Sequence, residues 1–303
     1  MSYILFVLSK ICAIIKIVAV KNCGNIASGP KNGTKISLIR SLGCILVGAA
    51  VCAISGFEEM TGTGMWISVI SGVSNAALLF FWILAATSAP LYFVELFCML
   101  GGVVLPLFIS SLTSDQAVSV LGWVGSGLLI VAALLLSKRS GGKINVKTFV
   151  IAIMAGLGNM GSVMTQKLYN SYFCGTIADF QLATYSVCAL TLAILLLILT
   201  ALSRRVAMLG NGEDTGYTKT APIRGKVLIF IIIATVMTYS SQFLSTAASA
   251  GIPAAIFYPL AYVISMPLVY LCDVIVYKEK VTLRGIIGII LVTLSGVLIN
   301  IKL

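Results

Sequence analysis

Ten long apolar segments follow one another along the 303-residue chain, separated only by short stretches rich in glycine, proline or charge. A helix needs about 20 predominantly apolar residues to cross the hydrocarbon core of a bilayer, and each segment is close to that length. The predicted spans are 2–22, 36–55, 65–87, 90–111, 120–137, 148–170, 179–203, 226–249, 252–276 and 283–301. We therefore expect an all-α integral membrane protein with ten transmembrane helices.

The composition excludes several other classes of protein. Hydrophobic residues make up 59% of the chain and charged residues only 10%, whereas a soluble domain carries about 25% charged residues. A soluble enzyme, a disordered chain and a nucleic-acid-binding domain are thereby excluded, so no nucleic-acid partner is expected. The expected location is the cell membrane, where the chain would be a multi-pass protein in contact with the lipid bilayer.

The residue types that most often carry catalysis or metal binding are scarce. The sequence has no histidine, and its eight cysteines form no Cys-x-x-Cys pair, which leaves no recognisable zinc or disulfide pattern. A membrane-embedded enzyme acting on lipids would also need a nucleophile–base pair. We therefore expect no catalytic residue, no metal site and no cofactor.

The second half of the chain repeats elements of the first. Lys16 and Cys23-Gly24 recur as Lys167 and Cys174-Gly175, at an offset of 151. At an offset of 161, the second half repeats Ala86, Ser88, Ala89, Pro106, Leu107, Gly127 and Val131. Two five-helix repeats, 1–140 and 141–303, would enter the membrane in opposite senses, because each holds an odd number of spans. Inverted repeats of this kind build transporters with a site at the repeat interface; the alternative is a duplication retained only for packing.

Basic residues predict the orientation in the membrane. The loops after the first, fifth, seventh and ninth spans hold 16 of the 20 Lys and Arg residues, with Lys21 and Arg40 counted in the first of these loops. Because cytoplasmic loops carry an excess of Lys and Arg, the count places these loops in the cytoplasm and both termini outside.

Polar and aromatic residues inside the spans are candidates for lining a cavity. In the 226–249 span, Thr235, Tyr239, Gln242, Thr246 and Ser249 follow one another at spacings of 4, 3, 4 and 3 residues, which is one helix face. The candidate substrate-binding residues are Asn75, Trp82, Asn159, Gln166, Tyr239, Gln242 and Tyr262. The alternative role is hydrogen bonding between helices, worth about 0.6 kcal/mol on average.

Glu95 and Lys167 are candidates for ion coupling. Glu95 lies inside the 90–111 span, where a charge costs about 2.5–3.5 kcal/mol. The carboxyl should therefore be protonated, paired with Lys16 or Lys167, or open to water; a position near the lipid headgroups is the alternative. Asp273 is expected at the membrane interface.

The last spans of the chain carry a pattern of proline and glycine around an acidic turn. In order, this pattern is Met266-Pro267, Tyr277-Lys278-Glu279-Lys280-Val281-Thr282, Gly285, Gly288-Ile289-Ile290 and Ser295-Gly296-Val297. Pro106, Gly125 and Gly127 repeat part of it in the first half, but Val118 stands where Glu279 would map.

This pattern, with the ten spans and the duplication, resembles the drug/metabolite transporter superfamily, specifically its ten-helix EamA-type branch. The resemblance implies movement of small metabolites, drugs, amino acids or sugar derivatives through a cavity between the two halves. Relatives are commonly described with both termini in the cytoplasm, which is the reverse of the orientation that the basic residues predict.

The expected function is therefore secondary transport of a small metabolite or drug-like solute by alternating access. No Gly-x-x-x-x-Gly-Lys loop is present to harness ATP directly. A lipid-carrier flippase of the same architecture and a non-transporting scaffold or sensor are the alternatives. The expected partner is a small-molecule substrate, and the protein is expected to be a monomer or a homodimer.

Overall fold

The computed structural model describes residues 1–26, 29–104, 120–137, 145–172, 175–208, 225–278, 281 and 283–300. Within these ranges the chain forms ten α-helices and one π-helical turn, η1, and no strand. In order they are α1 (Ser2–Ile26), α2 (Pro30–Ser55), α3 (Gly62–Ala86), α4 (Leu91–Met99), η1 (Leu100–Val104), α6 (Val120–Ser137), α7 (Val146–Ser171), α8 (Ile177–Met208), α9 (Lys226–Gly251), α10 (Ala254–Ile275) and α11 (Leu283–Asn300).

Each predicted span coincides with a helix. The fourth span, 90–111, is found as α4 followed by η1, and its last residues lie outside the described ranges. Six helices in the described part are long and apolar enough to cross a membrane: α1, α2, α3, α7, α8 and α9. The protein is thus all-helical in this part, with several helices that suit a bilayer.

Local sequence signals set the helix starts. Thr61 accepts a hydrogen bond from the Gly64 amide (3.1 Å) at the start of α3, and Asn145 accepts one from the Lys147 amide (3.2 Å) at the start of α7. Such caps satisfy amides that have no partner within the helix. Pro30 occupies the first turn of α2, where its missing N–H costs nothing, so this helix begins ahead of the predicted residue 36.

Two basic residues that the orientation count took as loop charges are buried within helices. Lys21 is 7% exposed near the end of α1, and Arg40 is 3% exposed within α2. In the folded chain the neighbouring helices surround both side chains, and the helices continue through them.

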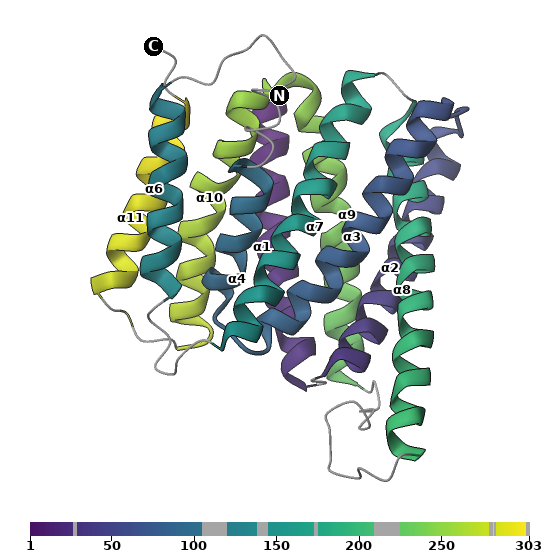
Figure 1. Ribbon diagram of the computed structural model, residues 1–303. Coiled ribbons are helices and arrows are strands. Elements are labelled where there is room, and N and C mark those ends of the chain that lie inside the picture. The colour runs from purple at the N-terminus through teal and green to yellow at the C-terminus, as the bar shows by residue number, and fades with distance from the viewer. Residues whose placement is uncertain are drawn as a thin grey trace.

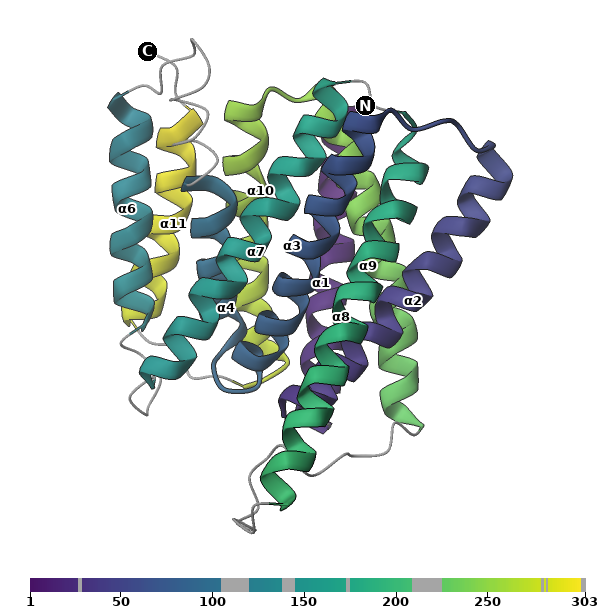
Figure 2. The same cartoon turned by 45° about the vertical axis from the view of Figure 1, so that its right-hand side comes forward.

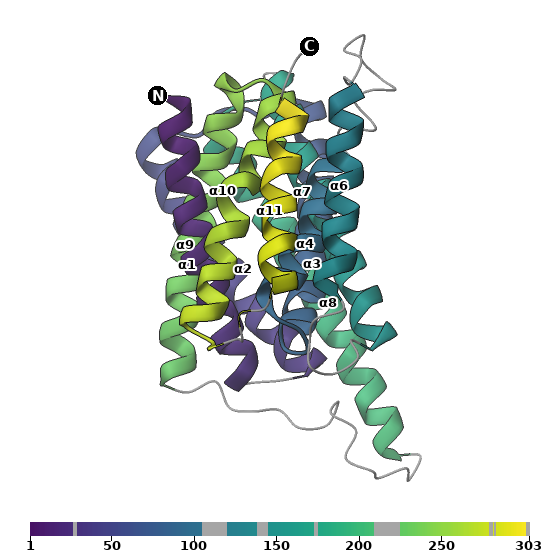
Figure 3. The ribbon, with the colours of Figure 1, turned by 90° about the vertical axis from the view of Figure 1, so that its left-hand side faces the viewer.

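The helices pack as long-range pairs, mainly α1 with α9, α3 with α7, α2 with α8 and α6 with α11. The α6–α11 pair stands at one end of the bundle and the α2–α8 pair at the other, with α1, α3, α7 and α9 between them (Figure 1). The turned view keeps α6 and α11 at the left and α2 at the right (Figure 2), and the end view brings α11 and α6 to the front (Figure 3).

Small residues allow α7 to approach its neighbours closely. A Cβ atom on Gly158 would lie 2.5 Å from the backbone nitrogen of Leu78 in α3, and one on Gly156 would overlap the Phe97 carbonyl in α4. The side chain of Ser162, one turn after Gly158, donates to Asn75 Oδ1 in α3 (3.2 Å). Gly158 and Ser162 therefore form a close helix-packing face on α7.

Candidate functional site

A polar cavity lies among α1, α2, α3, α4, α7, α9 and α10. It consists of two adjoining hollows, with about 60 and 100 Å³ of space that water molecules can enter, and both are lined by Lys16, Glu95 and Asn159. One water molecule needs about 10–15 Å³ of such space, so each hollow has room for several. We refer to the two hollows together as the central cavity.

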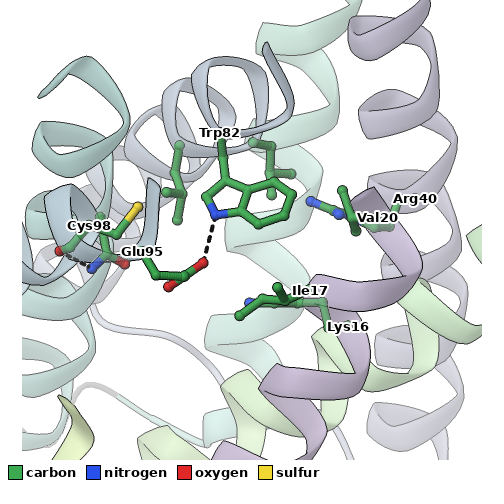
Figure 4. A pocket seen from close by; sticks show the side chains of 10 residues that line it. Lys16, Ile17, Val20, Arg40, Trp82, Glu95 and Cys98 are labelled. Atoms are coloured by element: carbon green, nitrogen blue, oxygen red, sulfur yellow. Dashed lines mark hydrogen bonds between the residues drawn. The ribbon is translucent and has the colours of Figure 1, made fainter. Parts of the chain in front are cut away.

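The indole ring of Trp82 forms part of the wall of the first hollow. Lys16 reaches it from α1, Arg40 from α2 and Glu95 from α4 (Figure 4). The indole N–H donates a hydrogen bond of 2.7 Å to Glu95 Oε1. This bond holds the carboxylate toward the cavity rather than toward lipid.

The second hollow is lined from the two halves of the chain. Lys10 and Lys16 contribute from α1, and Gln166 and Gln242 contribute from α7 and α9. The side-chain amide of Gln166 donates to Gln242 Oε1, which joins α7 to α9 at the cavity wall. Amide side chains can donate and accept hydrogen bonds, so this wall can contact a polar solute of either kind.

Asn159 belongs to both hollows. Its side-chain amide donates to the carbonyl of Cys98 (2.9 Å), close to the π-helical turn η1. In this turn Gly102 also lines the second hollow. A π-helical turn within an α-helix is often found at a functional site, and this one lies directly on the cavity wall.

Five of the nine sequence-predicted site residues meet at the central cavity: Trp82, Glu95, Asn159, Gln166 and Gln242. Asn75 accepts a hydrogen bond from Ser162 between α3 and α7. The ring of Tyr239 packs against Tyr185 and Phe243, with centroids 6.4 and 6.1 Å away. Neither Asn75 nor Tyr239 lines the two hollows. The side chain of Tyr262 lies outside the described part of the structure.

Lys167 is a residue of α7 whose ammonium reaches the C-terminal end of α9, where it donates to the carbonyls of Ser249 (2.6 Å) and Ile252 (3.0 Å). Asn170 donates nearby to the Thr246 carbonyl (2.6 Å). The last carbonyls of a helix have no partner within it and attract cations. Lys167 is therefore placed as a helix cap, and it makes no ion pair with Glu95.

Asp273 is buried inside the protein. It is 0% exposed and pairs with Lys21 (Nζ to Oδ1, 3.3 Å). It also accepts from the backbone amides of Leu91 (3.3 Å) and Tyr92 (2.8 Å), at the start of α4. Asp273 lies only five residues before Lys278 in the sequence, and this closeness to a charged residue suggested a position at the membrane interface. The covering groups come from α1 and α4, far away in sequence.

The cavity also contains residues that the sequence did not single out. Arg40 was counted with the loop charges and Lys10 was assigned no role, yet both line the cavity. No sequence signal separates a basic residue that faces a cavity from one that faces a loop. Within the described residues, no group of three His, Cys, Asp or Glu side chains is placed to hold a metal ion.

No family model and no curated protein matches this chain. Among solved structures, 27 chains match. One of them, described only as "Crystal structure of protein", aligns with 96% of this chain and 97% of its own length, at a TM-score of 0.55 and 13% sequence identity. At this identity the likeness shows the fold alone, and it shows that a known helical fold extends over nearly the whole chain.

Proposed function

We propose that this protein is a secondary transporter that moves a small solute across the cell membrane by alternating access. The observation that carries the proposal is the central cavity, a polar and charged space within a bundle of apolar helices. Polar groups at membrane depth are costly and mark substrate or ion pathways. The cavity takes residues from both halves of the chain, as expected for a site at a repeat interface.

The helix packing supports two inverted five-helix repeats, 1–140 and 141–303. In such a repeat each helix of the first half has an equivalent in the second: α1 matches α7, α2 matches α8, α3 matches α9, α4 matches α10 and α6 matches α11. Replacing every helix by its equivalent converts the α1–α9 contact into the α7–α3 contact. The same replacement converts α2–α9 into α8–α3 and α4–α6 into α10–α11, while α2–α8 and α6–α11 map onto themselves. All of these pairs are in contact. This pattern, together with the sequence repeats at offsets of 151 and 161, favours membership of the EamA-type drug/metabolite transporters.

A transport assay tests the proposal directly. Purified protein in proteoliposomes should exchange a solute across the membrane, and Asn159→Ala and Gln242→Ala should each reduce the rate, because both remove hydrogen-bonding groups from the cavity wall. The control is Ser186→Ala, which removes an exposed hydroxyl on α8 that bonds only within its own helix. A rate of solute exchange that neither Asn159→Ala nor Gln242→Ala alters would exclude the central cavity as the pathway.

The same assay separates the proposal from its alternatives. A lipid-carrier flippase would move a lipid-linked substrate between leaflets and leave water-soluble solutes untouched. A scaffold or sensor would move neither, although it could bind a ligand in the cavity.

A further inference from the structure

The central cavity carries more positive than negative groups. Its lining includes three basic side chains, Lys10, Lys16 and Arg40, and a single acidic one, Glu95. Glu95 already accepts the hydrogen bond from Trp82, and no ion pair within 4.0 Å joins it to a basic residue of the described part. The described lining therefore has an excess of positive charge.

Among these groups, Arg40 has the greatest need of a compensating negative charge. It is 3% exposed, and its Nε atom has no hydrogen-bond partner in the described residues. A guanidinium keeps its charge in a protein interior, and a buried charge is strongly unfavourable unless a counter-charge or several hydrogen bonds compensate it. Lysine can release its proton when it is buried, but arginine cannot.

The other buried acids of the described chain are already engaged elsewhere. Asp273 pairs with Lys21. Asp179 accepts from the Thr176 hydroxyl at the start of α8. Neither residue lines the central cavity, so within the described residues Arg40 has no anion of the protein beside it.

We infer that the central cavity takes an organic anion, with a carboxylate or phosphate oxyanion held between Arg40 and Lys16. This inference rests on the proposed transport function and names the class of substrate. The guanidinium offers a planar fork of donors that matches two oxyanion oxygens, and Lys16 adds a second positive charge from α1. The remainder of the solute would contact the Trp82 ring and the amides of Asn159 and Gln242.

Trp82 can report on binding. The chain has three tryptophans; Trp66 and Trp123 are exposed at 71% and 45%, whereas Trp82 is 7% exposed. The double variant Trp66→Phe/Trp123→Phe leaves Trp82 as the single tryptophan, which can be excited selectively over the tyrosines. Its emission is titrated with butyrate, with n-propyl phosphate, with the neutral butyramide, and with dodecyl phosphate in vesicles as a lipid-like anion.

Butyrate or n-propyl phosphate should change the Trp82 emission saturably, and butyramide at the same concentration should not. A response to dodecyl phosphate alone would assign the same oxyanion site to a lipid headgroup. Arg40→Gln should weaken the anion affinity about 10- to 100-fold, the loss expected for a hydrogen bond to a charged group. Lys16→Gln should weaken it in the same direction. Lys35→Gln, which removes a charge from α2 outside the cavity, should leave the affinity unchanged.

Equal binding of butyramide, no response to any anion, or an unchanged affinity in both Arg40→Gln and Lys16→Gln would overturn the inference. Its failure can be told apart from failure of the proposed function. Anion binding without solute exchange in proteoliposomes keeps the oxyanion site and overturns transport. Exchange of neutral solutes without anion binding keeps transport and overturns the oxyanion site.

Discussion

The indole N–H of Trp82 in α3 donates a 2.7 Å hydrogen bond to the carboxylate of Glu95 in α4, at the wall of a cavity that Lys16 and Arg40 also line. This bond connects two helices of the first half and fixes the carboxylate toward the cavity. An acidic group held at such a position is able to exchange a proton with whichever side of the membrane the cavity opens to. From this position we predict a coupling role for Glu95.

We predict that Glu95→Gln abolishes transport driven by a pH gradient but preserves solute exchange without a gradient. The amide keeps the shape of the carboxyl group and can still accept from Trp82, but it cannot carry a proton. The measurement is solute uptake into proteoliposomes with and without an imposed pH gradient. Glu59→Gln, on an exposed segment after α2, is the matched control. Gradient-driven uptake that persists in Glu95→Gln would remove Glu95 from the coupling step.

A second prediction concerns Lys167, a residue of α7 whose side chain contacts the C-terminal end of α9. Lys167→Met removes donors to the Ser249 and Ile252 carbonyls, and hydrogen bonds to charged groups are worth roughly 1.5–3 kcal/mol. We expect a lower melting temperature and an unchanged response to a pH gradient. Lys147→Met, at an exposed position on α7, should change neither the melting temperature nor the response to a pH gradient. Loss of gradient-driven uptake at an unchanged melting temperature would instead restore Lys167 as a coupling residue.

The buried pair of Lys21 and Asp273 should be essential for stability. Asp273→Asn keeps an oxygen near the amides of Leu91 and Tyr92 but leaves the Lys21 charge uncompensated. Breaking a buried ion pair in this way costs about 3–5 kcal/mol, which should appear as a strongly reduced melting temperature. The double variant Lys21→Met/Asp273→Asn should recover part of the loss, because no lone charge remains. A double variant less stable than Asp273→Asn alone would show that Lys21 acts through other contacts, such as the Tyr277 ring 4.0 Å from its ammonium.

The close contact between α7 and α3 gives a fourth prediction. Gly158→Ala places a methyl group against the Leu78 backbone, and overpacking of this kind typically costs about 1–3 kcal/mol. The control is Gly127→Ala in α6, where an added Cβ meets no atom within 4 Å. Thermal unfolding in detergent should therefore separate the two variants, with Gly158→Ala melting earlier. Equal melting temperatures would mean that α7 can move away from α3 without cost.

The sequence was sufficient to predict the ten helices, because long apolar segments have few alternatives in a bilayer. Helix ends were less exact: α2 begins at Pro30 rather than at residue 36, and α1 continues to Ile26 rather than ending at residue 22. The periodicity of the polar residues identified Gln166 and Gln242, which do meet at the cavity. A helix face indicates a direction and does not identify the neighbour in that direction.

Asn75, predicted to line a cavity, accepts a hydrogen bond from Ser162 between two helices and is not among the residues that line the two hollows. Arg40 was missed because a charge near a predicted span end has the same pattern whether it faces a loop or a cavity. The excess of positive charge at the site depends on α1, α2 and α4 converging there. The sequence of a single helix does not show which other helices will pack beside it.

The orientation in the membrane is the last prediction. The excess of basic residues in the odd-numbered loops predicts that these loops are cytoplasmic, so the exposed segment after α2 should face outward. Glu58→Cys lies on that segment, and Lys147→Cys lies at the opposite end of the bundle, in the first turn of α7. In intact cells a membrane-impermeant maleimide should label Glu58→Cys, and it should label Lys147→Cys only after permeabilisation. The parent protein, with its native cysteines, gives the background. The reverse labelling pattern would place both termini in the cytoplasm, as is commonly described for EamA-type transporters, and would show that the basic residues buried in α1 and α2 do not act as orientation signals.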